Sequence, residues 1–195
     1  MSLRRAAFVD RDGVINALTA DPVTGRPESP LRVEDVALLP GVAAALTGLA
    51  GGGWLLVGVS NQPSAAKGFV SVAAIEAVQN RVLSLLRDEG VEFDAFELCL
   101  HHPDGIVPEL TGRCDCRKPA PGMLLAAAGR LAIELGSSWM IGDTDGDMLA
   151  GRAAGCRTIL VTHEPSAHKR GGAQADLLVP DLAAAAAALL ANNAR

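Results

Sequence analysis

Residues 6–16 have the sequence AAFVDRDGVIN, in which a short apolar run meets two acids. The run AAFV is followed directly by Asp10 and Asp12, and Gly13 comes next. Apolar runs of this length that end in a polar turn are typical of buried strands in parallel sheets. Two carboxylates at positions i and i+2 repel each other when they share a site. A chain that holds them together after a strand is therefore expected to use them.

Five further apolar runs follow along the chain, with helix-length segments between most of them. The runs are WLLVGV, FELCL, SWMI, TILV and LLV, at residues 54–59, 96–100, 138–141, 158–161 and 177–179. The segments expected to be helical are residues 41–50, 71–89, 121–135, 145–154 and 181–192. This alternation predicts an α/β fold. We expect a doubly wound, Rossmann-like parallel sheet with helices on both faces and no large cap domain.

The composition favours one globular domain. The chain has 195 residues, of which 49% are hydrophobic, so we expect a single domain spanning residues 1–195. The net charge is -5 and the basic residues are scattered, which argues against a nucleic-acid partner. No apolar run approaches the ~18 residues of a membrane helix, and none resembles a signal peptide. We expect a cytoplasmic monomer without a membrane partner.

Polar residues follow three of the expected strands. Asp10 and Asp12 follow the first, Ser60 and Asn61 the second, and Asp143 the run that ends at residue 141. Ligands of open α/β sheets bind beyond the carboxyl ends of the strands. An isolated Asp-x-Asp is usually a turn or a helix cap, and residues such as Ser60 and Asn61 commonly follow strands. Their arrival at one edge from three segments instead predicts a binding site.

These groups suit phosphoryl transfer. Asp10 and Asp143 offer hard oxygen ligands to Mg²⁺, which would also relieve the repulsion between the acids. Ionised Asp10 is then expected to attack phosphorus and form an aspartyl-phosphate. Asp12 is placed to protonate the leaving alcohol and later to deprotonate water. The alternative for Asp143 is a helix cap, because acids favour helix N-termini; Asp147 is expected only to support the site.

Ser60 and the backbone amides around Asn61 are expected to hold the transferring oxygens. Lys118, which precedes the helix expected from residue 121, would offset their developing charge. A lone lysine is more often a solvated surface residue.

A zinc site is indicated at the ends of a long irregular segment, residues 101–122. Cys99-x-His101 and Cys114-x-Cys116 supply three thiols and one imidazole, the donor set of a tetrahedral structural site. Such a zinc would staple a loop that lacks secondary structure of its own. Both pairs are spaced more tightly than the usual two to four intervening residues, so free thiols are the alternative. His102 is an alternative ligand to His101.

A zinc there would be an organiser and not a catalyst. Arg117 directly follows the last cysteine, so a closed zinc site would hold its guanidinium against a second acidic group of a substrate.

The motifs DRDGV, SNQ, CRKPAPGM and GDTDGDM occur in that order over about residues 8–155. They resemble the four motifs of the haloacid dehalogenase superfamily of phosphatases. The text CDCRKPAPGML, with CLHH upstream, is similar to the heptose 1,7-bisphosphate phosphatases and the sister histidinol-phosphate phosphatases. The resemblance favours His101 over His102 as the zinc ligand. It implies these roles: Asp10 as nucleophile, Asp12 as general acid/base, Mg²⁺ at Asp10, the Asp12 carbonyl and Asp143, and substrate contacts from Ser60, Asn61, Arg117 and Lys118.

Three positions depart from that resemblance. Residues 17–30 form a longer and different segment after the first motif, Thr144 stands where lysine is frequent, and Pro63 stands where a small hydroxyl residue is common. The four motifs themselves are intact, so we expect a phosphatase of a small phosphorylated sugar that removes the C7 phosphate of heptose 1,7-bisphosphate. Histidinol phosphate and other sugar or cyclitol phosphates are the alternative substrates. A zinc-stapled binding module without activity is disfavoured. Such a module would have no reason to retain four catalytic residues together, namely Asp10, Asp12, Lys118 and Asp143.

Overall fold

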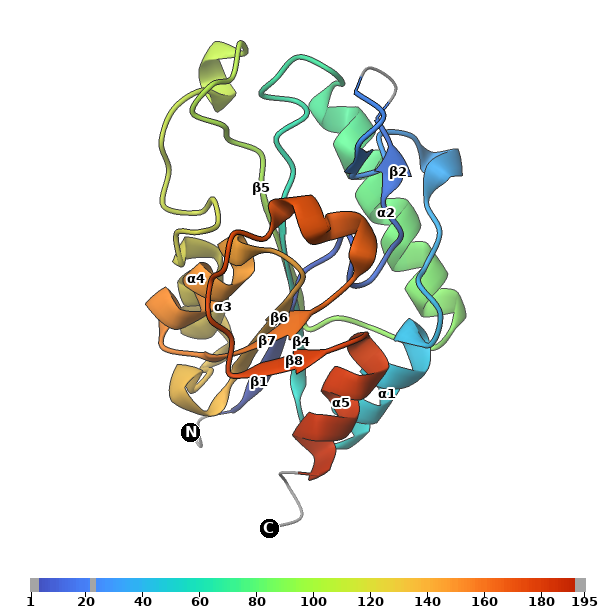
Figure 1. Cartoon of the computed structure of the whole chain (residues 1–195), viewed down its shortest axis with the longest axis vertical. Coiled ribbons are helices and arrows are strands. Elements are labelled where there is room, and N and C mark those ends of the chain that lie inside the picture. The colour runs from blue at the N-terminus through green and yellow to red at the C-terminus, as the bar shows by residue number, and fades with distance from the viewer. Residues whose placement is uncertain (1–3, 22–23, 192–195) are drawn as a thin grey trace.

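The computed structural model describes residues 4–21 and 24–191. Six strands form one parallel sheet in the order β5-β4-β1-β6-β7-β8 (Figure 1). Their bounds are β1 (Ala6–Val9), β4 (Leu55–Asn61), β5 (Ala95–Cys99), β6 (Trp139–Gly142), β7 (Arg157–Val161) and β8 (Leu177–Val179). Strand β1 lies at the centre, where Ala7 is in register with Leu56 of β4 and Trp139 of β6. The predicted strands and their parallel pairing are confirmed.

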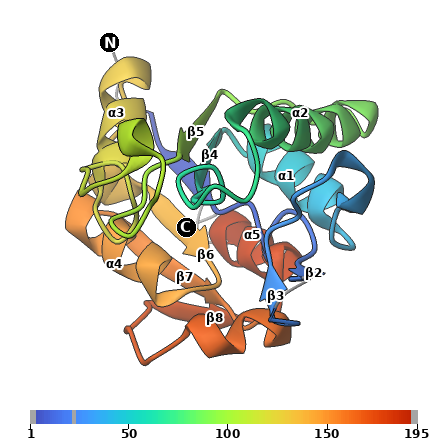
Figure 2. The same cartoon turned by 90° about the horizontal axis from the view of Figure 1, so that it is seen from above.

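Helices cover both faces of this sheet (Figures 1 and 2). On one face lie α1 (Val42–Gly51), α2 (Val72–Asp88) and α5 (Leu182–Ala191), and on the other lie α3 (Gly122–Leu131) and α4 (Asp145–Ala154). Side chains of β1 alternate between the two cores, with Ala7 and Val9 facing the first group and Ala6 and Phe8 the second. The doubly wound architecture is confirmed, and no large cap domain interrupts it in the described residues.

The two long connections of the fold, from β1 to α1 and from β5 to α3, carry only short elements. The first contains the antiparallel pair β2 (Thr19–Ala20) and β3 (Pro27–Glu28) and the 3₁₀ turn η1 (Val33–Asp35). The second contains the 3₁₀ turn η2 (Pro108–Leu110), so the expectation that it has no secondary structure of its own is wrong. Two further 3₁₀ turns are η3 (Leu135–Ser137) and η4 (Glu164–Lys169).

Helix α3 ends earlier than the predicted boundary at residue 135. Ala132 adopts the left-handed conformation, with φ 54° and ψ 52°, and the N–H of Ile133 then donates to the Ala128 carbonyl oxygen at 3.0 Å. This turn buries Ile133 in the core beside α3. The end predicted for the last helix, residue 192, lies outside the described residues. None of the helices described is both long enough and apolar enough to cross a membrane.

Candidate active site

Strands β1, β4 and β6 bring the predicted polar side chains to one edge of the sheet. Asp10 follows β1, and its N–H donates to the Ile141 carbonyl oxygen of β6 at 2.9 Å. Asp143 follows β6. Strand β4 ends two residues later than expected, so Ser60 and Asn61 form its end rather than the turn after it. The convergence that the sequence predicts is present.

Gly13 allows the first and last acidic motifs to approach each other. Its φ is +90°, a left-handed conformation that L-residues with a side chain rarely adopt. A Cβ at this position would lie 2.1 Å from Oδ2 of Asp143. A glycine is therefore required for the Asp143 carboxylate to lie against the turn that follows β1.

Three buried carboxylates gather at this edge, from Asp10, Asp143 and Asp147. One oxygen of each lies within 4.8 Å of the others. Burial, together with the neighbouring Asp147, raises the pKa of Asp143 to about 7. Burial also raises the pKa of Asp10, although Lys118 opposes the rise. Neither oxygen of Asp143 has a hydrogen-bond partner among the described residues. Unpartnered hard oxygens with excess negative charge fit a divalent cation such as Mg²⁺.

Lys118 is the cation within this acidic cluster. Its Nζ lies 2.6 Å from Oδ1 of Asp10 and 2.6 Å from Oδ1 of Asp147, and it donates to the Val59 carbonyl oxygen at 2.8 Å. Burial alone would lower the pKa of Lys118, but the two carboxylates raise it above its ordinary value. The side chain is buried and charged, which excludes the alternative of a solvated surface lysine.

The side chain of Asn61 holds the backbone of Lys118 in place. Its Nδ2 donates to the Lys118 carbonyl oxygen at 2.9 Å, and its Oδ1 accepts from the Lys118 N–H at 3.0 Å. Both polar ends of the Asn61 amide are therefore occupied by the backbone of Lys118. Ser60 is buried, and its Oγ accepts from Nε2 of Gln62 at 2.9 Å.

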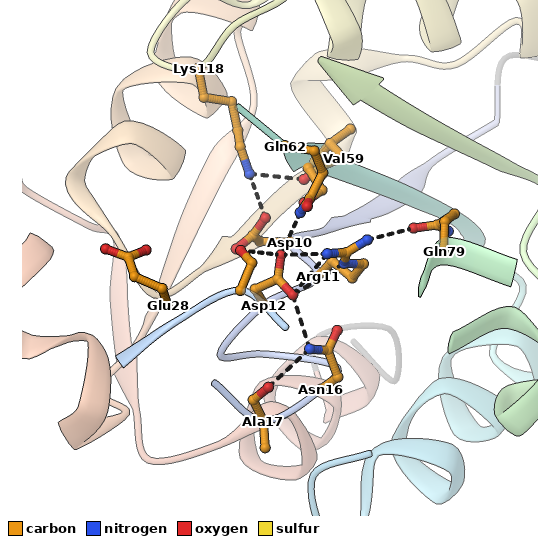
Figure 3. A network of polar contacts seen from close by, with 12 residues as sticks. Asp10, Arg11, Asp12, Asn16, Ala17, Glu28, Val59, Gln62, Gln79 and Lys118 are labelled. Atoms are coloured by element: carbon orange, nitrogen blue, oxygen red, sulfur yellow. Dashed lines mark hydrogen bonds and ion pairs between the residues drawn. The ribbon is translucent and has the colours of Figure 1, made fainter. Parts of the chain in front are cut away.

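Asp12 lies in a dense network of donors (Figure 3). Its carboxylate accepts from Nη2 of Arg11 at 3.0 Å, Nδ2 of Asn16 at 2.9 Å, Oγ of Ser29 at 2.9 Å and Nε2 of Gln62 at 2.6 Å. Burial would raise the pKa of Asp12, but the Arg11 guanidinium and these hydrogen bonds lower it. The sequence predicts no role for the four donors. Three of them lie in or beside the motifs DRDGVIN and SNQ, which is the signal that could have found them.

The segment after the first motif reaches the site. Ser29 follows the hairpin strand β3 and contacts Asp12, while Glu28 at the end of β3 pairs with Lys169 of η4 at 2.7 Å. The departure that the sequence shows at residues 17–30 therefore lies against the candidate acid/base.

Asp147 has a larger part in the site than the sequence predicts. Besides meeting Lys118, it accepts from the N–H of Thr144 at 3.0 Å and from its Oγ1 at 2.7 Å, in a capping box at the start of α4. Thr144 is the N-cap of α4. Asp145 is the first residue of α4, and its Oδ2 accepts from the Gly171 N–H at 2.7 Å.

The four predicted zinc ligands also come together. One donor atom each from Cys99, His101, Cys114 and Cys116 lies within 4.8 Å of the others. The Sγ of Cys116 is 3.2 Å from that of Cys114 and 3.5 Å from Nδ1 of His101. All three cysteines are free thiols. Three sulfurs and one imidazole converging without a disulfide fit a tetrahedral zinc site.

His102 is not among the side chains that gather with the three cysteines, and its Nδ1 accepts from the Asp104 N–H at 3.1 Å. The irregular segment of residues 101–122 is called the cysteine loop below. Nη1 of Arg117 donates to the His101 carbonyl oxygen at 3.3 Å, which connects the guanidinium to the start of this loop. The remaining cysteine, Cys156, is buried in the core between α3, α4 and the sheet.

Comparison with known proteins agrees with this arrangement. The family model described as HAD-hydrolase-like matches residues 115–185. The crystal structure of D,D-heptose 1,7-bisphosphate phosphatase from B. bronchiseptica, complexed with magnesium and phosphate, superposes with a TM-score of 0.80 and 29% identity over 96% of this chain and 99% of that one. The fold and the acidic site define a HAD-like phosphatase, a phosphoric monoester hydrolase.

Two curated relatives are similar over most of their length. The D-glycero-beta-D-manno-heptose-1,7-bisphosphate 7-phosphatase of Pseudomonas aeruginosa is 32% identical over 96% of this chain and 98% of its own. The protein of the same name from Escherichia coli K12 is 36% identical over 82% of this chain and 81% of its own. The chain belongs to the D-glycero-β-D-manno-heptose-1,7-bisphosphate 7-phosphatase family.

Proposed function

We propose that this phosphatase removes the C7 phosphate of D-glycero-D-manno-heptose 1,7-bisphosphate. The assignment of phosphoryl transfer rests on one observation, the buried Asp10–Lys118 ion pair inside a cluster of acids. The choice of substrate is supported by relatives named as D-glycero-beta-D-manno-heptose-1,7-bisphosphate 7-phosphatases, which match nearly the whole chain.

Asp10 is the proposed nucleophile and Asp12 the proposed general acid/base. The Asp10 carboxylate attacks phosphorus, the bond from phosphorus to the sugar oxygen breaks, and Asp12 gives that oxygen a proton. In the second step Asp12 takes a proton from water as the water oxygen attacks phosphorus. The bond between phosphorus and the Asp10 oxygen breaks, which releases inorganic phosphate and restores the Asp10 carboxylate. Because the pKa of Asp12 is lowered in the free site, its first proton must be supplied. A monoanionic substrate phosphate, with a second pKa of about 6, brings one.

The residues around the nucleophile bind the transferring phosphate. Nζ of Lys118 is placed to balance charge that develops on the phosphate oxygens, and Ser60 offers a hydroxyl at the end of β4. Asn61 contributes its backbone N–H to phosphate binding. Its side-chain amide holds Lys118 in place through the N–H and the carbonyl oxygen of that residue.

Two metal ions complete the proposal. Asp10, Asp143 and the backbone carbonyl of Asp12 would hold Mg²⁺, which would neutralise phosphate charge when bound. The magnesium and phosphate in the complex of the B. bronchiseptica protein support this assignment. A structural zinc ion would be held by the four clustered side chains of Cys99, His101, Cys114 and Cys116.

Arg117 is proposed to bind the second phosphate of the substrate. Arg117 is half-buried, and its guanidinium is anchored to the cysteine loop through the His101 carbonyl oxygen. A planar guanidinium suits bidentate binding of a phosphate or carboxylate.

We further propose that the chain functions as a cytoplasmic, monomeric, single domain without nucleic-acid or membrane partners. The free thiols and the dispersed charge of the sequence support this proposal.

The test is incubation of the purified protein and Mg²⁺ with heptose 1,7-bisphosphate, followed by phosphorus NMR of the product. The proposal predicts loss of the C7 phosphate and retention of the C1 phosphate, with no turnover by Asp10→Asn. Loss of the C1 phosphate, or no hydrolysis of the heptose alongside rapid hydrolysis of another sugar phosphate, would overturn the substrate assignment.

A further inference from the structure

A fully buried arginine lies between the candidate acid/base and helix α2 (Figure 3). Arg11 is 0% exposed and heads the largest fully buried side chains of the described residues. Its Nη1 donates to Oε1 of Gln79 on α2 at 3.1 Å. Its Nε and Nη2 donate to Asp12 at 3.2 and 3.0 Å. A guanidinium without water must be paired on all sides, and here the pairing joins two separate elements.

Arg11 differs from the other donors to Asp12 in how it binds the carboxylate. Nη2 of Arg11 contacts both oxygens, Oδ1 at 3.1 Å and Oδ2 at 3.0 Å. Asn16 reaches Oδ1 alone, and Ser29 and Gln62 reach Oδ2 alone. Among the described residues, Arg11 is therefore the one donor that contacts both oxygens of Asp12, and so by itself it restrains the rotation of that carboxylate. The rigid fork of a guanidinium suits that task, and an ammonium does not.

Gln79 holds the opposite end of the guanidinium. It is 7% exposed, and its contact with Arg11 is the one side-chain hydrogen bond it makes in the described part of the chain. Its Nε2 has no partner there. The polar group of Gln79 therefore faces inward from α2 toward Arg11, and α2 is coupled to Asp12 through a continuous chain of contacts.

We propose that Arg11 is a positioning residue that, anchored by Gln79, aims the Asp12 carboxylate for proton transfer to the leaving group. This inference rests on the proposed role of Asp12. A purely structural ion pair would support all substrates alike. A positioning role is specific to leaving groups that need a proton, because para-nitrophenolate departs without one and an alkoxide does not.

The experiment compares kcat/KM for para-nitrophenyl phosphate and for glycerol phosphate, an alkyl ester, in four variants. kcat/KM reports events up to formation of the aspartyl-phosphate, when the alcohol has left. Arg11→Lys keeps the charge and removes the fork. Gln79→Met keeps the Arg11–Asp12 pair and removes its anchor. Asp12→Asn is the reference for lost acid catalysis. Arg32→Lys is the matched control, because Nε and Nη2 of Arg32 bind Asp35 in the same manner on the surface.

We expect Arg11→Lys to lose at least about tenfold more kcat/KM on glycerol phosphate than on the aryl ester, the scale found for residues that orient a reacting group. Gln79→Met should also lose more kcat/KM on glycerol phosphate than on the aryl ester, and it tests the positioning role if Arg11→Lys does not fold. Arg32→Lys should leave kcat/KM unchanged for both esters. Equal losses on both esters in Arg11→Lys and Gln79→Met, while Asp12→Asn discriminates between them, would overturn the positioning role alone. Equal losses in Asp12→Asn would overturn the proposed role of Asp12 and the inference with it.

Discussion

The Asp10–Lys118 pair concentrates the proposed chemistry in two side chains. Asp10→Asn is nearly isosteric and should fold, yet an amide cannot form the aspartyl-phosphate. We expect no detectable turnover of para-nitrophenyl phosphate and an unchanged circular dichroism spectrum. Residual activity that withstands repurification of the variant would exclude Asp10 as nucleophile.

Gly13 gives a second residue-scale prediction, with a natural control at Gly155. Both have positive φ, +90° and +88°, but a Cβ on Gly155 meets nothing within 4 Å, whereas one on Gly13 meets Asp143. Alanine at either position should cost about 1–2 kcal/mol of stability through backbone strain. Only Gly13→Ala should also raise the Mg²⁺ concentration needed for half-maximal activity. An equal Mg²⁺ requirement in both variants would show that the contact with Asp143 does not matter.

At this scale the sequence predicts the acids because they follow strands, and it predicts Lys118 because that residue lies in the motif CRKPAPGM, just before the helix expected from residue 121. It does not reveal the partners of Arg11 or Asn61. Gln79 is 68 residues from Arg11 and Lys118 is 57 residues from Asn61, and no local pattern records such contacts.

The cysteine loop is the element whose order depends on the proposed zinc. Cys114→Ser removes one of four ligands and should lower both the zinc content, from about one ion per chain, and the melting temperature. Cys156→Ala is the control, because Cys156 is buried away from the cluster. Elemental analysis of protein prepared without chelators measures the zinc. A wild-type preparation with none would mean that the cysteines act as free thiols.

Strands β7 and β8 are joined by an acid-sensitive contact. Asp176 accepts from the Thr158 N–H at 2.7 Å and from its Oγ1 at 2.8 Å, and these bonds lower the pKa of Asp176. The contribution to stability is therefore full above the ordinary pKa of about 3.9 and is lost as the pH falls through the lower folded value. Urea unfolding should show Asp176→Asn destabilised at pH ~6 and closer to wild type at pH ~3. A destabilisation independent of pH would contradict this.

Element boundaries show where sequence patterns stop being informative. The strands are predicted because apolar runs end in polar turns. The end of α3 is not, because Ala132 turns left-handed without a glycine or proline to mark it, and packing of Ile133 decides the boundary.

For the whole molecule, the sheet order places β1 between β4 and β6 and so brings three distant motifs to one edge. The cysteine loop carries Arg117 next to Lys118, and both belong to the connection between β5 and α3. In the proposed mechanism this arrangement would provide a site for the transferred phosphate and, beside it, a cation for a second anionic group. The specificity proposed here depends on that pairing.

The substrate preference is the most direct test of this account, measured as steady-state kcat/KM for heptose 1,7-bisphosphate and for histidinol phosphate in wild type and Arg117→Ala. The account predicts a higher kcat/KM for heptose 1,7-bisphosphate than for histidinol phosphate. Arg117→Ala should reduce this preference, expressed as a difference in activation free energy, by about 1.5–3 kcal/mol, the scale of a charge-assisted hydrogen bond. A wild-type preference for histidinol phosphate, or equal losses on both substrates in Arg117→Ala, would contradict it.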